Sequence, residues 1–402
     1  MNRHLISVLG IDFYKGEDDM KKAVRKLRRF FRRRGGVRSL KRFLGVVLAL
    51  ALTTGFTAFG VKNIPSAIGN ITLVSSLFAL PEGTGTKKQE TAAPPEPTPP
   101  IEEEDPPIEQ EAVSGAVIDP ETEPPALEVK ESDRGRIIEE KFSSTADKSA
   151  VIYKNGTIKN YTELSLDKIE NILKTDWAET LVSDSQTVQV LVMHTHTTES
   201  YEPYDRDYYD VNYSARTLDE EYNMIRVGNA LAKALSENGI GVVHDTTVHD
   251  YPSYNGSYER SAETVEGWLE KYPTIKVVID VHRDAIERTV SGETVRVKPT
   301  TEIDGKKAAQ LMIIAGCDDG KMGMPDWEEN LRFGAALQNQ LEADYPSLTR
   351  PLMFDYRKYN QDLTTGSILV EVGGHANSLD EAVYSAELLG KSLSKLIKTY
   401  MD

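Results

Sequence analysis

VQVLVMHTHTTES, residues Val188–Ser200, joins an apolar run to a polar run that contains two imidazoles and a carboxylate. Six mostly apolar residues followed at once by polar ones are typical of a buried strand that ends at the edge of a sheet. Further short apolar runs follow along the chain, at residues 241–243, 276–281, 309–315 and 367–372. The pattern therefore predicts a sheet with residues 188–193 as an early strand.

Helical patterns separate these runs, at residues 218–238, 258–271, 326–344 and 379–400. Strands that alternate with helices indicate an α/β fold, because each helix can return the chain to begin another strand in the same direction. We expect a mixed, mostly parallel sheet with helices on both faces over residues 188–402. A smaller lead-in region, 137–187, precedes it and contains the hairpin-like stretch VIYKNGTIKNY.

The N-terminal part of the chain has a different character. Residues 1–60 carry 14 Lys and Arg against 4 Asp and Glu, whereas the whole chain has a net charge of -16. A basic arm, 1–42, precedes an uncharged stretch long enough as a helix to cross a bilayer core. We expect a transmembrane helix at 43–62 with a cytoplasmic N-terminus. A cleaved signal peptide fits less well, because the basic region is long and no A-x-A site follows.

The next segment predicts an extracytoplasmic linker at 63–136. It holds eleven of the nineteen prolines between Pro81 and Pro125, interleaved with Glu, Thr and Ala, and such a composition favours a disordered tether. The acidic balance of the chain beyond residue 60 argues against a nucleic-acid partner. A single cysteine, Cys317, excludes a disulfide within the chain.

Imidazole and carboxylate side chains follow three of the predicted strands. His194, His196 and Glu199 follow the first, His282 ends the third, and Glu371 lies within the last, in ILVEV. Parallel strands of an open α/β sheet bring such groups to one edge. Zinc hydrolases use three His or carboxylate ligands, an open position for water, and a further carboxylate that takes a proton. The spacing therefore suggests a zinc hydrolase site.

Each of these residues also has a simpler interpretation. A lone histidine at a strand end is more often a hydrogen-bonded cap than a ligand, and we interpret His244 and His249 in this way. Glu371 is different, because an unpaired carboxylate in an apolar strand is costly and usually has a partner or a function. Of His194 and His196, either could be the ligand, and the other would support it or bind substrate.

The strings HTHTTESY, VVIDVHRDA, YNQDLTTGSILVEVGGHANS and DEEYNMIRVGNALAKAL resemble the stage II sporulation protein P family, from residue 149 to the C-terminus. The catalytic domain of this family is similar to the zinc N-acetylmuramoyl-L-alanine amidases. The resemblance implies a peptidoglycan hydrolase of engulfment during endospore formation. It also implies the membrane and other engulfment proteins as partners, such as a lytic transglycosylase and a membrane scaffold.

The amidase pattern implies a role for particular residues. His196, or His194 in its place, Glu220 at the start of a helix, and His282 become the ligands of Zn²⁺. Glu371 becomes the general base that takes a proton from water and returns it to the leaving amine. The amidases' Gly-rich turn is replaced here by HTHTTES.

Because of that departure, Glu199 competes with Glu220 as a ligand, and Glu221 is a further alternative. Glu199 is otherwise a candidate for substrate binding. Arg283, Asn360 and Gln361 are further candidates for holding the stem peptide, since each lies close in sequence to a catalytic element. A surface or loop hydrogen bond is an equally good interpretation of these three.

The implied reaction is hydrolysis of the amide between N-acetylmuramic acid and L-alanine, and the family is also credited with cutting peptide cross-links. An alternative is a catalytically silent wall-binding scaffold of the same fold. Such a scaffold should have lost a ligand or Glu371, and neither is clearly lost. A zinc carboxypeptidase or deacetylase acting on the same polymer is a third option, and it would demand a different order of ligands along the chain.

Overall fold

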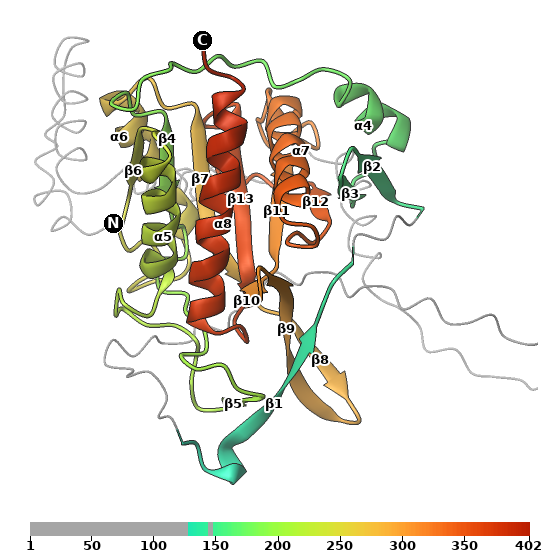
Figure 1. The fold of residues 1–402 in the computed structure, drawn as a ribbon, viewed down its shortest axis with the longest axis vertical. Helices are drawn as coiled ribbons and strands as arrows, with labels where there is room; N and C mark the ends of the chain where they lie inside the picture. Colours follow the sequence, from blue (N-terminus) through green and yellow to red (C-terminus); the bar gives the residue numbers. More distant parts are fainter. Residues whose placement is uncertain (1–127, 144–147) are drawn as a thin grey trace, which may run out of the picture. The chain divides into compact units, whose positions relative to one another are not determined.

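The computed structural model describes residues 128–143 and 148–402 (Figure 1). The basic arm at 1–42, the predicted transmembrane helix at 43–62 and most of the predicted linker lie outside these residues. Within the two described ranges, no helix combines the length and apolar character that crossing a membrane requires.

The main sheet has the strand order β2-β3-β12-β11-β13-β7-β4-β6. The strands β6, β4, β7 and β13 are parallel neighbours, β11 is antiparallel to β13, β12 and β3 continue parallel to β11, and β2 closes a hairpin with β3. Their bounds are β2 Ala150–Tyr153, β3 Gly156–Asn160, β4 Val190–Met193, β6 Val242–His244, β7 Val277–Asp284, β11 Leu311–Gly316, β12 Leu352–Asp355 and β13 Gly366–Gly374. The predicted mixed, mostly parallel sheet is therefore confirmed. The hairpin predicted in the lead-in region also forms, but it belongs to this sheet, because β3 pairs with β12.

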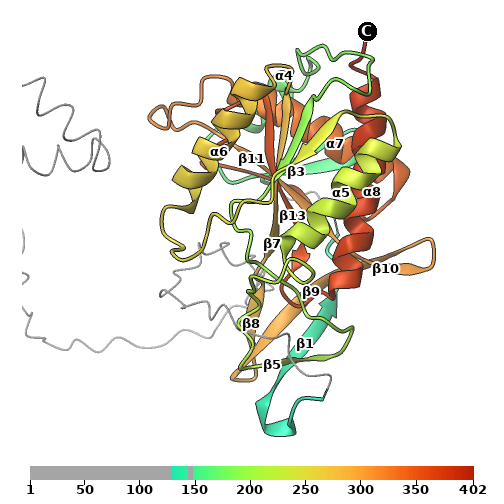
Figure 2. The same ribbon diagram turned by 90° about the vertical axis from the view of Figure 1, so that its left-hand side faces the viewer.

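Helices cover the two faces of this sheet unequally (Figure 2). One face packs against α5, α7 and α8, and its apolar cluster includes Leu231, Leu337 and Leu393 of these helices. The other face packs against α6, whose Val265 contacts a smaller cluster that includes Leu191. The helix bounds are α4 Leu166–Ile172, α5 Met224–Glu237, α6 Ser257–Lys271, α7 Trp327–Asp344 and α8 Leu379–Lys398.

The apolar cluster under α6 draws its strand residues from β4 and β7. Farther along the same sheet face, Met312, Ile314, Met353 and Leu369 form a separate small cluster with Tyr359 packed against it. Successive residues of a strand point to opposite faces, so these side chains are the ones that the α7 and α8 side does not use. All of them except Met312 line the pocket described below.

A second sheet, with the order β10-β9-β1-β5 and with β8 paired to β9, does not appear among the predicted strands. Its bounds are β1 Arg134–Glu140, β5 Tyr208–Asp210, β8 Glu287–Val290, β9 Glu293–Ile303 and β10 Lys306–Ala309. The sequences RGRIIEE and ETVRVKPTTEI mix charged with apolar residues, so no apolar run marks them. β1 pairs with β9 in parallel across more than 150 residues of sequence, which local patterns cannot predict.

The start of the helix predicted at 218–238 is wrong by six residues. α5 begins at Met224, and the side chain of Asn223 caps it by accepting a hydrogen bond from the Ile225 amide at 3.0 Å. The backbone carbonyl of Asp219 accepts from the amides of Tyr222 and Asn223, so this part of the chain turns before the helix. An asparagine at the cap competes with helix continuation, which explains the later start.

Candidate active site

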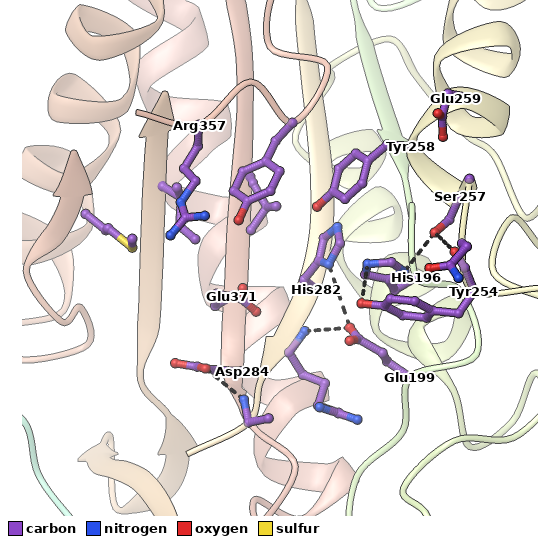
Figure 3. A pocket seen from close by; sticks show the side chains of 18 residues that line it. His196, Glu199, Tyr254, Ser257, Tyr258, Glu259, His282, Asp284, Arg357 and Glu371 are labelled. Carbon is purple, nitrogen blue, oxygen red and sulfur yellow. Dashed lines mark hydrogen bonds and ion pairs between the residues drawn. The ribbon is translucent and has the colours of Figure 1, made fainter. Parts of the chain in front are cut away.

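A pocket of ≈ 340 Å³ opens beside the start of α6 (Figure 3). Side chains from the ends of three parallel strands line it: His196 and Glu199 follow β4, His282 and Asp284 end β7, and Glu371 lies in β13. His282 and Glu371 are register partners of neighbouring strands, so their side chains point to the same face. The structure therefore brings together most of the groups that the sequence places after these strands.

His196 and His194 point to opposite sides of the sheet, because β4 ends at Met193 and the chain turns there. His196 lies in the pocket, with its ring stacked on Tyr254 at a centroid distance of 4.4 Å and perpendicular to His282 at 5.2 Å. Its Nε2 shares a hydrogen bond with the Tyr254 hydroxyl at 3.0 Å. Burial, together with the nearby charges of His282 and Arg216, holds the pKa of His196 well below its usual value.

His194 is buried on the side of α5. Its Nδ1 bonds the Val281 carbonyl oxygen at 2.9 Å, and its Nε2 lies 2.9 Å from Nε2 of His244. Burial lowers the pKa of His194 to about 3, so the ring is neutral, and Nδ1 donates to the carbonyl. A Cβ on Gly228 of α5 would lie 2.5 Å from Nε2 of His194, so the glycine allows the helix to approach these rings. His194 therefore joins α5 to the sheet.

Glu199 reaches the pocket from the loop after β4. Its Oε2 accepts a hydrogen bond from the Arg283 amide at 3.2 Å and lies 3.8 Å from Nδ1 of His282. Its Oε1 pairs with Arg216 at 3.4 Å, and Arg216 in turn pairs with Asp250 at 3.0 Å. All of these side chains are buried, so the loop holds a carboxylate in one orientation next to His282.

His282 is oriented by a second carboxylate. Its Nε2 lies 2.9 Å from Oδ1 of Asp280, an ion pair whose angle departs from that of a hydrogen bond. Asp280 also accepts hydrogen bonds from the amide and hydroxyl of Thr195 at 2.8 and 2.7 Å. Burial alone would lower the pKa of His282, but Asp280 together with the charges of Glu199 and Glu371 outweighs it and raises the pKa to about 9. This arrangement leaves Nδ1 of His282 facing Glu199.

Glu371 is half-buried at the pocket wall, and its Oε2 is buried without a hydrogen-bond partner in the described part of the chain. Loss of hydration, with the nearby charge of Asp284, raises the pKa of Glu371 to about 8. Asp284 itself is paired with the buried Arg350 at 2.7 Å. An unpartnered carboxylate with a pKa near neutrality is suited to accept and release a proton.

The structure does not bring Glu220 to this pocket. Glu220 and Glu221 are exposed in the turn before α5, because the helix starts later than predicted. The carboxylate that reaches the pocket from this region is Glu199. The register that suggested Glu220 depended on a continuous helix from residue 218, and the capping of α5 by Asn223 removes that basis.

The three predicted stem-peptide residues are all engaged within the protein. Arg283 lines the pocket, but its guanidinium donates to the backbone oxygens of Ser200 and Ala215. Asn360 donates to the Tyr258 carbonyl at 2.8 Å, and Gln361 holds the backbone of β11 through two hydrogen bonds. Neither amide lines the pocket.

Sequence reasoning missed several residues that do line the pocket, namely Tyr254, Tyr258, Arg357 and Tyr359. Tyr254 and Tyr258 flank the start of α6, and Arg357 and Tyr359 lie in the loop after β12. Aromatic residues at a helix start and in a loop have no distinguishing local pattern. The one available signal was the closeness of Arg357 and Tyr359 to Asn360 and Gln361, which did point to the correct loop.

The donor types in the pocket fit a zinc ion, since two imidazoles and a carboxylate are a ligand set that zinc hydrolases use. The ion pair between His282 and Asp280 is also the kind of carboxylate contact that orients a metal-binding histidine. Among residues 128–143 and 148–402, however, no three His, Cys, Asp or Glu side chains converge closely enough to hold a metal ion. Nε2 of His196 is hydrogen-bonded to the Tyr254 hydroxyl.

Comparison with known proteins identifies the family. The family model described as stage II sporulation protein P matches residues 100–394. A curated relative, stage II sporulation protein P of Bacillus subtilis (strain 168), is 29% identical over 219 residues. The match covers 52% of this chain and 50% of the relative, so the chain spans about half the length of the curated relative that it matches.

Solved structures with some similarity include three N-acetylmuramoyl-L-alanine amidases. AmiC2 of Nostoc punctiforme is 12% identical with a TM-score of 0.30, covering 53% of this chain and 96% of its own. Ami1 of Mycobacterium smegmatis is 13% identical with a TM-score of 0.33, covering 54% and 100%. An amidase of Clostridium difficile 630 is 15% identical with a TM-score of 0.32, covering 54% and 97%. At TM-scores this low, the similarities support no further conclusion about this chain.

Proposed function

Because the chain belongs to the stage II sporulation protein P family, we propose that it is a zinc-dependent peptidoglycan hydrolase that acts during endospore formation. The proposed reaction is hydrolysis of the amide between N-acetylmuramic acid and L-alanine, with peptide cross-links as a second target. The observation that supports it best is the meeting of His196, Glu199, His282 and Glu371 in one pocket.

His196, His282 and Glu199 are the residues that would hold the zinc ion. When bound, the ion would polarise the scissile carbonyl and make water more acidic. The site is suited to a cation, because Glu199, Asp280, Asp284 and Glu371 lie around it. Burial and, after it, the charges of Asp284 and Glu199 raise the pKa of Glu371. His196 would have to exchange its hydrogen bond with Tyr254 for the ion.

The chain's own groups have separable roles in this proposal. Glu371 accepts a proton from the attacking water and returns it to the leaving nitrogen. Asp280 holds the His282 ring through Nε2, and Thr195 fixes Asp280. Arg216 and the Arg283 amide hold Glu199. Groups that are already oriented lower the activation barrier, because they do not have to reorganise during the reaction.

Digestion of purified peptidoglycan tests the proposed bond directly. Protein comprising residues 128–402 retains all of β1, which begins at Arg134. We expect mass spectrometry of the digest to show stem peptides with a free L-alanine N-terminus and glycan strands with free lactyl groups. Cuts confined to the glycan, or to bonds within the peptides, would contradict the amidase reaction.

We also propose that the protein is anchored in the cell membrane by one helix at 43–62, with its N-terminus in the cytoplasm and the pocket outside. The basic run before residue 43 supports this orientation. Protease added to intact protoplasts should then remove the C-terminal region and leave the basic arm protected. Protection of the C-terminal region would reverse the orientation.

The proposed partners follow from the family and this location. They are peptidoglycan as substrate, the membrane, and other engulfment proteins such as a lytic transglycosylase and a membrane scaffold. The net charge of -16 does not favour a nucleic-acid partner.

A further inference from the structure

The pocket continues past the candidate catalytic groups over an apolar floor. Leu369 of β13, Ile314 of β11 and Met353 of β12 are register partners across three neighbouring strands, and all three line the pocket. Leu369 precedes Glu371 by two residues on the same face of β13. Residues two apart on a strand are separated by about 7 Å. The apolar floor therefore begins about 7 Å from Glu371, roughly the length of two peptide residues.

Two tyrosines flank this floor. Tyr258 and Tyr359 are stacked at a centroid distance of 5.2 Å and both line the pocket. Tyr359 has φ 42° and Asn360 has φ 57°, a left-handed backbone that residues with a side chain, asparagine excepted, rarely adopt. Strain of this kind persists only where surrounding contacts impose it, and it is common at binding sites.

The contacts that impose it come from the next two residues. Asn360 donates to the Tyr258 carbonyl and to the Ser261 hydroxyl, at 2.8 and 3.0 Å. Gln361 accepts from the Gly316 amide at 2.8 Å and donates to the Ile314 carbonyl at 3.0 Å. These four hydrogen bonds fix the loop after β12 so that Arg357 and Tyr359 face the pocket.

The guanidinium of Arg357 is fixed through its Nε atom, whereas its two terminal nitrogens face the pocket. Its Nε donates to Oδ2 of Asp355 at 2.9 Å, while Oδ1 of Asp355 accepts from the Tyr356 amide at 2.8 Å. Within the described ranges, its two terminal nitrogens have no hydrogen bond or ion pair, in contrast to the guanidinium of Arg283, which binds two backbone oxygens. Figure 3 shows Arg357 above Glu371, on the side of the pocket away from Asp284.

We propose that this end of the pocket is a subsite for the stem peptide, in which Arg357 binds a free carboxylate on the second peptide residue. The substrate class rests on the proposed function, but the subsite itself rests on the geometry above. A guanidinium fixed at Nε presents its two terminal nitrogens as a fork, which matches a carboxylate. The apolar floor accommodates small aliphatic groups of a peptide, and the carboxylates at the other end of the pocket would repel the same anion.

Two N-acetylmuramoyl peptides, identical except that the second residue carries either a carboxylate or a carboxamide, test this proposal. Binding is measured by calorimetry on the full chain carrying Glu371→Gln, and turnover is measured on the full chain with Glu371 intact. We expect the carboxylate peptide to bind roughly 10- to 100-fold more tightly than the carboxamide, in line with a charge-assisted hydrogen bond. Arg357→Gln should abolish this preference by weakening only the carboxylate peptide.

Lys358→Gln is the matched control, because Lys358 is the next residue, carries the same charge and pairs with Asp362 outside the pocket lining. It should leave the preference unchanged. Equal binding of the two peptides, or an unchanged preference in Arg357→Gln, would overturn the subsite. So would an equal loss for both peptides, which would indicate a structural role for Arg357.

The two measurements separate this proposal from the proposed function. Selective binding that depends on Arg357, without any cleavage, would support the subsite and contradict the hydrolase. Cleavage of both peptides at equal rates and with equal affinities would support the hydrolase and contradict the subsite.

Discussion

Glu371→Gln is expected to hydrolyse purified sacculi about 10²–10⁴ times more slowly than the unaltered protein while still binding them. Glutamine keeps the size of the side chain and its place in β13, but it cannot accept a proton. The buried, unpartnered Oε2 makes the substitution mild for folding, because no hydrogen bond within the described part of the chain depends on that atom. Release of stem peptides and sedimentation with sacculi measure the two properties.

The zinc content of the same variant decides between two roles for Glu371. A general base can be removed without loss of the metal, so bound zinc should stay at the level of the unaltered protein. Loss of zinc from Glu371→Gln would make Glu371 a ligand. Full activity would exclude the proposed mechanism for this chain.

Zinc content should also distinguish His196→Ala from His194→Ala, and Glu199→Gln from Glu220→Gln. His196→Ala and Glu199→Gln are expected to lose most of their zinc and nearly all hydrolytic activity, because both side chains lie in the pocket. Glu220→Gln should keep both, since Glu220 is exposed in the turn before α5. Metal analysis of the purified variants checks each pair under identical conditions.

His194→Ala should behave differently from His196→Ala. It removes the partner of the Val281 carbonyl and of His244, each left unsatisfied at a cost of about 1–3 kcal/mol. We therefore expect a lower midpoint of thermal unfolding with zinc still bound below that temperature. If His194→Ala lost zinc at full stability, or Glu220→Gln lost zinc while Glu199→Gln kept it, the site assigned from the structure would be wrong.

The outcome of the sequence analysis differs between the two sheets. Strands such as β4 and β13 are buried on both faces, so they appear as apolar runs and were predicted within about two residues. β1 and β9 carry charged residues along a half-exposed sheet, and their partners are distant in sequence. The burial of Lys298 in β9 depends on its ion pairs with Asp205 and Glu381, which no local pattern reveals.

In the candidate site, the directions of residues on strands could be predicted from the sequence, whereas the directions of residues in loops could not. His282 and Glu371 lie within strands, so their strand position already fixes which face they point to, and both reach the pocket. The predicted residues Asn360 and Gln361 lie in the loop that borders the pocket, but their amides hold that loop while Arg357 and Tyr359 face the pocket. A loop has no period from which side-chain direction can be deduced.

The sequence by itself determined the α/β order of the chain, the family, and the delivery of imidazoles and carboxylates to one end of parallel strands. Only the tertiary structure decided that His196 faces the pocket in place of His194, and Glu199 in place of Glu220. The physical reason is that these residues lie beyond the ends of regular elements. Their directions are set by long-range contacts, such as those of Arg216 with Glu199 and Asp250, and those of His194 with His244 and with the backbone of α5 at Gly228.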